Sequence, residues 1–149
     1  MKKYKVAILG ATGAVGREMM KVLAERDFPA EELHLLASER SVGQVLPWKG
    51  QDIAVELACD EAFEGMDIVL GAAENDIAKR FAPAIVRSGA VFVDNSSAFR
   101  MDPDVPLVIP EINPEDAGKH KGIIANPNCT TIVSLVAINA LNQDSPIES

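Results

Sequence analysis

A glycine-rich turn near the N-terminus constrains the fold more than any other feature of this sequence. Residues 10–16 read G-A-T-G-A-V-G, a G-x-x-G-x-x-G pattern, and they follow the apolar segment Tyr4–Leu9. Residues 13–25 then carry apolar side chains at the spacing of a helix that buries one face. A buried strand, a glycine turn and an amphipathic helix in this order predict the first unit of an α/β fold that holds a dinucleotide.

Small residues are favoured in this turn for a chemical reason. A backbone without side chains lets a pyrophosphate approach closely, and the N-terminus of the next helix offers free N–H groups and the positive end of its dipole. Gly16 would let that helix pack closely on the sheet. The alternative is a tight strand-to-helix turn that binds no ligand.

The rest of the chain alternates short apolar runs with amphipathic segments. Further strands are expected at 33–37, 66–71, 90–94 and 122–125, and helices at 77–88 and 129–141. This alternation predicts an α/β fold, a doubly wound and mostly parallel sheet of the Rossmann-like dinucleotide-binding kind. A strand at 53–57 is expected outside the main parallel set. Pro83 predicts either a helix start or a kink, and residues 101–121, with four prolines, a long ordered connection.

Charge and composition exclude several classes of protein. The net charge is −8 and the chain has no basic cluster, so it is a poor candidate for binding nucleic acid. No apolar run reaches the roughly 18 residues of a membrane span. The two cysteines do not make a disulfide framework, and no metal site is expected. We therefore expect a cytoplasmic protein.

The segment after the second predicted strand bears on which dinucleotide binds. An acid there binds the ribose 2′-hydroxyl of NAD, whereas NADP needs a cation and hydroxyl groups. The residues after Ala37 are Ser38, Glu39, Arg40 and Ser41. Arg40 can pair with a 2′-phosphate through two hydrogen bonds, and both serines can donate to it. We predict NADP and expect Glu39 to point away; a solvated polar loop is the alternative.

Two further side chains suit chemistry on an acyl group. Cys129 follows a predicted strand and begins a predicted helix, whose dipole would stabilise a thiolate nucleophile. Arg100 follows the strand at 90–94, at the edge where parallel sheets bind ligands, and could hold a phosphate or a carboxylate. The alternatives are an inert buried cysteine and a surface arginine paired with an aspartate. Cys59 has no comparable setting.

Four blocks together resemble the aspartate-semialdehyde dehydrogenases. They are the glycine turn, V-D-N-S-S-A-F-R-M at 93–101, V-I-P-E-I-N-P at 108–114 and A-N-P-N-C-T-T-I at 125–132. The likeness extends from about residue 6 to about residue 138. It implies that L-aspartyl 4-phosphate is reduced with NADPH to L-aspartate 4-semialdehyde and phosphate, in the synthesis of lysine (through diaminopimelate), threonine and methionine. The related N-acetyl-glutamyl-phosphate reductases share the fold and a catalytic cysteine, which usually follows Pro-Gly.

The resemblance also implies roles for single residues. Cys129 matches the nucleophile, Arg100 the residue that binds the substrate's phosphate, and Asn128 a helper in that site. The implied cofactor contacts are Gly10, Thr12, Gly13, Ala14, Val15, Ser38, Arg40, Ser41 and Ala72.

Members of this family are more than twice as long. We expect residues 1–141 to be the NADP-binding domain, 142–149 a tail, and the second domain, which supplies a histidine acid/base and most of the contacts between subunits, to be absent. The chain should then bind NADP with little or no activity alone. The alternatives are a nucleotide-binding or interaction module that is not an enzyme, and another acyl-phosphate reductase.

Overall fold

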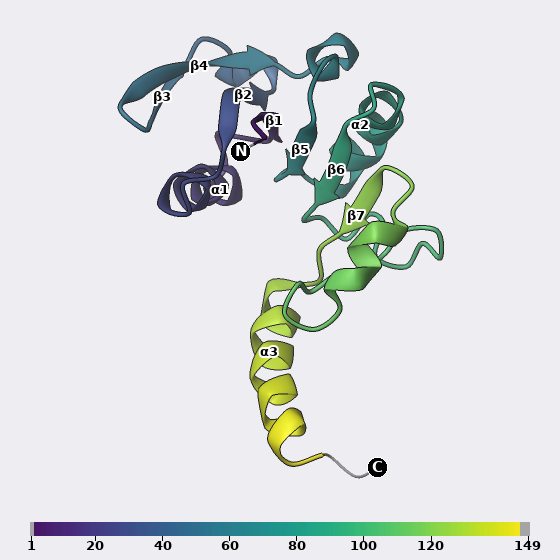
Figure 1. The fold of residues 1–149 in the computed structure, drawn as a ribbon. Helices are drawn as coiled ribbons and strands as arrows, with labels where there is room; N and C mark the ends of the chain where they lie inside the picture. The colour runs from purple at the N-terminus through teal and green to yellow at the C-terminus, as the bar shows by residue number, and fades with distance from the viewer. Residues whose placement is uncertain (1, 147–149) are drawn as a thin grey trace.

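The computed structural model describes residues 2–146 and places them in one α/β arrangement around a twisted sheet (Figure 1). The bounds of its strands are β1 Tyr4–Leu9, β2 Ala30–Ala37, β3 Val45–Trp48, β4 Gln51–Leu57, β5 Ile68–Gly71, β6 Val91–Asp94 and β7 Ile123–Ala125. The α-helices are α1 Ala14–Glu25, α2 Asn75–Arg87 and α3 Cys129–Asp144. Short 3-10 helices occur at Glu39–Ser41, Asp60–Phe63 and Pro114–Lys119.

The seven strands form one sheet in the order β3-β4-β2-β1-β5-β6-β7. Every neighbouring pair is parallel except β3 with β4. The chain leaves β1 toward β2 on one side and leaves β5 toward β6 on the other. The carboxyl ends of β1 and β5 therefore form the point where the strand order reverses, which is where open α/β sheets bind ligands. The predicted fold class is confirmed.

Two apolar clusters form the core, one on each face of the sheet. On one face, Met20 of α1 packs with Ile8 and Leu35. On the other, Phe81 and Ile85 of α2 pack with residues of β1, β5 and β6. Alternate residues of β1 enter opposite clusters, as the period of two in a strand requires. The sheet is thus covered on both faces, as the sequence predicts.

The edge of the sheet differs from the prediction. β4 was expected outside the parallel set, but it lies in the main sheet, parallel to β2. β3, which the sequence pattern did not reveal, pairs with β4 through a two-residue turn in which Lys49 and Gly50 both have positive φ. Pro47 is tolerated because β3 is an edge strand. The Trp48 indole donates to the Met20 carbonyl at 2.9 Å and attaches the hairpin to α1.

Three smaller expectations have different outcomes. Pro83 lies inside α2 and not near its start. The connection at 101–121 contains the 3-10 helix Pro114–Lys119, so it is ordered, as predicted. α3 continues to Asp144, and the first residues of the expected tail are therefore helical. The last residues of that tail, 147–149, lie outside the described residues.

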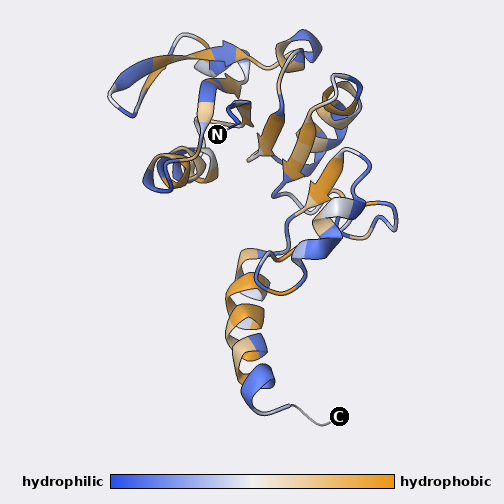
Figure 2. Cartoon of the chain, in the orientation of Figure 1, coloured by the Kyte–Doolittle hydropathy of each residue, from blue (hydrophilic) through white to orange (hydrophobic). Residues whose placement is uncertain are grey.

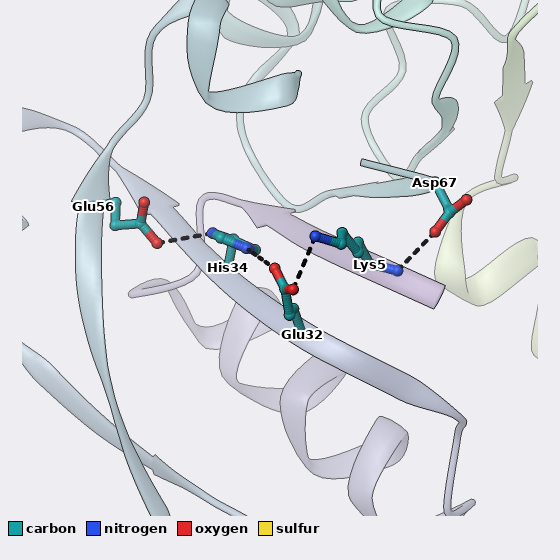
Figure 3. Close-up of polar contacts among 5 residues, drawn as sticks. All are labelled: Lys5, Glu32, His34, Glu56 and Asp67. Atoms are coloured by element: carbon teal, nitrogen blue, oxygen red, sulfur yellow. Dashed lines mark hydrogen bonds and ion pairs between the residues drawn. The ribbon is translucent and has the colours of Figure 1, made fainter. Parts of the chain in front are cut away.

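A row of polar side chains crosses one face of the sheet, from the carboxyl end of β4 through β2 to the amino end of β1 (Figure 3). His34 contacts Glu56 at 3.0 Å and Glu32 at 3.3 Å, and Glu32 pairs with the Lys5 ammonium at 2.8 Å. The hydrogen bond with Glu32 raises the pKa of Lys5, and the same bond lowers the pKa of Glu32. Lys5 and His34 alternate along their strands with residues that pack on the α1 face of the sheet. The row therefore lies on the α2 face, in a part of it that is exposed to solvent.

α3 leaves the sheet and points away from the body of the domain (Figure 1). Its surface is largely apolar (Figure 2), and no residue from Cys129 to Gln143 is charged. None of its residues is buried against the rest of residues 2–146. No helix among the described residues is long and apolar enough to cross a membrane.

Replacing Gly16 by alanine should destabilise the domain. A Cβ at this position would overlap the Gly10 carbonyl oxygen and lie 2.7 Å from the Ala11 Cα, and both atoms belong to the backbone. We expect a loss of about 2 kcal/mol in the free energy of unfolding, as for other overpacked sites, measured by urea denaturation.

Gly118→Ala is the matched control, because nothing lies within 4 Å of a Cβ there. Its stability should change by less than about 0.5 kcal/mol. Equal stability of the two variants would show that α1 does not need this close approach.

Candidate active site

A cleft of about 510 Å³ opens at the point where the strand order reverses. The carboxyl ends of β1, β2, β4 and β5 and the first turns of α2 form its walls. Its lining residues are Leu9, Gly10, Thr12, Gly13, Ala37, Ser38, Glu39, Leu57, Ala58, Ala72, Ala73, Glu74, Ile77, Arg80 and Phe81. The structure therefore brings together the glycine turn, Ser38 and Ala72, which the sequence placed far apart along the chain.

The glycine turn closes one wall of this cleft. Gly10 has φ +89°, and its Cβ, if present, would lie 2.8 Å from the Ala72 carbonyl oxygen. The turn is fixed by two hydrogen bonds, from the amides of Gly10 and Ala11 to the Leu36 carbonyl, at 2.8 and 3.2 Å. Gly10 thus needs both its positive φ and its missing side chain, because β5 lies directly beside it.

The turn fits a pyrophosphate. Within residues 2–146, the amides of Thr12, Ala14, Val15 and Gly16 have no hydrogen-bond acceptor, and α1 has no side-chain cap at its N-terminus. Four free N–H groups at the positive end of a 12-residue helix are donors for an anion. Thr12 and Gly13 line the cleft, whereas Ala14 and Val15 are exposed just beside it.

The segment after β2 differs in part from the expectation. Ser38 and Glu39 both line the cleft, so Glu39 does not lie away from it as expected. Arg40 is exposed and lines no part of the cleft, because Glu39–Ser41 form a 3-10 turn that places consecutive side chains around its axis. The Ser41 hydroxyl lies 3.4 Å from the Thr12 hydroxyl, which connects this turn to the glycine turn.

The sequence did not single out the far wall of the cleft. Ile77 and Phe81 lie on one face of α2, at the spacing typical of a helix face that packs on a core. Arg80 lies between them in the cleft wall; its guanidinium pairs with Asp60 at 2.8 Å and lies 4.5 Å from the centre of the Phe81 ring. The apolar spacing of α2 was the available signal in the sequence. This spacing does not distinguish a helix face that lines a cleft from one that packs in a core.

Arg100 is held against the loop that leads to Cys129. Its Nε donates to the Asn126 carbonyl at 2.9 Å, and one Nη donates to the Asn95 carbonyl at 3.0 Å. Arg100 is half-buried and forms no ion pair with any carboxylate in residues 2–146. The alternative of a surface arginine paired with an aspartate is therefore wrong.

Cys129 is the first residue of α3 and is exposed. Asn128 precedes it as the N-cap, and its side-chain oxygen accepts from the Thr130 amide at 2.9 Å. The expected position of the thiol at a helix N-terminus is confirmed, and the alternative of a buried cysteine is wrong.

The site has two parts along one edge of the sheet. The first is the cleft with the glycine turn; the second contains Arg100, Asn128 and Cys129, none of which lines that cleft. Between them lies a shallower hollow of about 470 Å³, lined by Ala73, Glu74, Asn75, Asp76 and Ser96. No group of three or more His, Cys, Asp or Glu side chains in residues 2–146 is arranged to hold a metal ion.

In comparisons with known proteins, both the sequence and the structure of this chain are similar to aspartate-semialdehyde dehydrogenases. An aspartate-semialdehyde dehydrogenase of Synechocystis sp. is 57% identical over 144 residues, 97% of this chain and 43% of that protein. A crystal structure of aspartate semialdehyde dehydrogenase II from Vibrio cholerae, complexed with ASA, superposes with a TM-score of 0.94 at 44% identity, over 99% of this chain and 49% of that one. The Candida albicans enzyme with NADP gives a TM-score of 0.75 at 26% identity, over 98% and 48%. The chain thus spans less than half the length of these relatives.

The family described as semialdehyde dehydrogenase, NAD binding domain, matches residues 5–120. The match contains the glycine turn, the segment after β2 and Arg100. The chain therefore belongs to the semialdehyde dehydrogenase family as its NAD-binding domain, and the resemblance to aspartate-semialdehyde dehydrogenases is confirmed.

Proposed function

We propose that this chain is the cofactor-binding and nucleophile-bearing part of an NADP-dependent aspartate-semialdehyde dehydrogenase. The reaction is the reduction of L-aspartyl 4-phosphate to L-aspartate 4-semialdehyde with release of phosphate. One observation carries the proposal: an arginine that has no carboxylate partner in residues 2–146 is held on the loop that presents an exposed cysteine at a helix N-terminus. That pair suits an acyl phosphate, whose phosphate needs a cation and whose carbonyl carbon needs a nucleophile.

The cleft at the glycine turn is the proposed dinucleotide site. The free amides at the N-terminus of α1 would hold the pyrophosphate, and Ala72 would allow close approach along the end of β5. Ser38, Ser41 and Arg40 would bind the 2′-phosphate of NADP. When bound, NADPH supplies the hydride for the reduction.

Cys129 is the proposed nucleophile. Its thiolate sulfur forms a bond to the acyl carbon, and the bond between that carbon and the phosphate oxygen breaks with both electrons on phosphate. The product of this step is a thioester on Cys129. Arg100 stabilises the phosphate as its charge grows, and the Asn128 side chain orders the first turn of α3 around the thiol.

The product would serve the synthesis of lysine, through diaminopimelate, and of threonine and methionine. A cytoplasmic location is consistent with two free cysteines in the described residues. The whole enzyme would act as an oligomer on small-molecule substrates.

The chain should bind NADPH more tightly than NADH. Loss of the Arg40 guanidinium, in Arg40→Ala, should weaken NADPH binding by about tenfold, because a charged hydrogen bond contributes about 1.5–3 kcal/mol. NADH affinity should not change. Isothermal titration calorimetry measures both constants, with the exposed arginine Arg26→Ala as the matched control.

Glu39 makes this experiment decisive. Glu39 lines the cleft, and its carboxylate would accept a hydrogen bond from the free 2′-hydroxyl of NADH. If the wild-type domain prefers NADH, Glu39→Gln should therefore remove that preference. A wild-type preference for NADH, or no binding of either nucleotide, would overturn the NADP assignment.

Cys129 should be alkylated faster than Cys59 near neutral pH. Both thiols are free, but Cys129 is exposed at the N-terminus of a 16-residue helix, whereas Cys59 is half-buried. We expect at least about a tenfold difference in rate with iodoacetamide, because reaction depends on the thiolate fraction and on access. Mass spectrometry of digested samples assigns the sites, and Cys59→Ser is the control that must keep the fast phase.

The exposed surface of α3 favours one other function, an interaction module. Val133 is 74% exposed and Leu141 68%, on a helix without charge from Cys129 to Gln143. A continuous apolar surface of this kind favours association with another protein surface.

If α3 is such a surface, the chain should elute as larger species in size-exclusion chromatography as its concentration rises. Val133→Lys should shift elution back to the monomer, because it places a charge in the apolar surface. Met101→Lys is the control, since Met101 is 93% exposed but lies outside α3. A strict monomer at every concentration would count against the module.

A further inference from the structure

Two asparagine side chains join the loops that follow β6 and β7. These strands are parallel neighbours that end in register, Asp94 opposite Ala125. The next residue on each strand is an asparagine, and the Asn126 side-chain amide donates to the Asn95 side-chain oxygen at 2.7 Å. A backbone bond from the Asn126 amide to the Asp94 carbonyl, at 2.8 Å, lies beside it. The two loops are thus tied together immediately beyond the sheet.

The same two residues hold the Arg100 guanidinium through their backbone carbonyls. Nε donates to Asn126 and one Nη donates to Asn95, at 2.9 and 3.0 Å. A guanidinium is planar and rigid, so two bonds from one group to two fixed carbonyls determine the direction of the whole fork. The side-chain bond between the asparagines fixes the separation of those carbonyls. Arg100 is therefore oriented by a pair of residues that carry no charge.

In this orientation, part of the Arg100 guanidinium remains available to donate hydrogen bonds to a ligand. Of its five N–H donors, two are used, and within residues 2–146 the other three have no protein partner. Asp94, which ends β6 directly before Asn95, is fully buried, and its two oxygens accept from the amide and from the hydroxyl of Ser96. Its carboxylate is thus engaged locally and does not neutralise Arg100. The free donors are suited to an oxyanion.

We propose that Asn95 and Asn126 are positioning residues, which aim Arg100 at the phosphate of the substrate bound at Cys129. The inference rests on the proposed function, because it takes Arg100 as the phosphate ligand and Cys129 as the nucleophile. Asn126 is separated from Cys129 by the buried Pro127 and the N-cap Asn128. Tying Asn95 to Asn126 therefore ties the cation to the loop that carries the thiol.

The test measures how inorganic phosphate protects Cys129 from iodoacetamide in the full chain. Phosphate is varied at constant ionic strength, and the rate of alkylation at Cys129 is followed by mass spectrometry. In wild type, phosphate should slow alkylation, and Arg100→Ala should remove that protection. Asn95→Ala and Asn126→Ala should each require about tenfold more phosphate for half protection, while the rate without phosphate stays within about twofold of wild type.

A double variant separates positioning from general damage. Asn95→Ala and Asn126→Ala remove the same hydrogen bond, so combining them should weaken phosphate protection no further than either alone. Asn113→Ala is the matched control: this asparagine also makes side-chain hydrogen bonds in the connection between β6 and β7, but none with Arg100. It should lower the melting temperature without changing the phosphate dependence.

The outcomes distinguish the two proposals. If phosphate fails to protect wild type, or protects Arg100→Ala equally, the role of Arg100 in the proposed function is overturned, and this inference with it. If Arg100→Ala loses protection but both asparagine variants keep it, only the positioning role is overturned. If an alanine variant is unfolded by circular dichroism, Asn95→Ser or Asn126→Ser replaces it, with the same expected loss of protection.

Discussion

The close approach of the Gly10 backbone to the carbonyl of Ala72 is the constraint on which the cofactor half of this domain depends. It joins the carboxyl end of β1 to that of β5, where the strand order reverses, and a Cβ at Gly10 would prevent it. Gly16 then brings α1 down on the same turn. The amides of Thr12, Ala14, Val15 and Gly16, at or beside this cleft, remain without acceptors in residues 2–146. The proposed anion site is a consequence of this packing.

The elements that the sequence predicts well are those whose pattern is local. The glycine turn lies between β1 and α1 as expected, and the buried runs at β5, β6 and β7 are strands. The pairing of β4 could not be predicted from its own residues, because it depends on β2 and on the turn at Lys49 and Gly50, which returns the chain to the sheet edge. That lysine-glycine pair was a weak signal for a hairpin, since only its glycine favours a positive φ.

The candidate site was predictable in its residue types more than in its geometry. Arg100 and Cys129 could be proposed because they follow strands, at the edge where parallel sheets bind ligands. Whether Glu39 or Arg40 faces the cleft depends on the 3-10 turn at Glu39–Ser41, which the composition of a short polar loop does not determine. The bond between Asn95 and Asn126 was equally inaccessible, because it joins residues 31 positions apart.

The two parts of the site are held to one edge of the sheet by opposite kinds of interaction. At the cofactor end, Gly10 and Gly16 have no side chain, so backbone segments come into contact there. The proposed binding groups are backbone amides that the fold holds in place. At the thiol end, the adjacent loops after β6 and β7 are joined by polar side chains, and the cation is aimed by the carbonyls of Asn95 and Asn126. A dinucleotide pyrophosphate needs many weak donors in a fixed arc, whereas a departing phosphate needs one strong, oriented charge. In the proposed function the strand ends supply both, because register in a parallel sheet brings successive loops to the same edge.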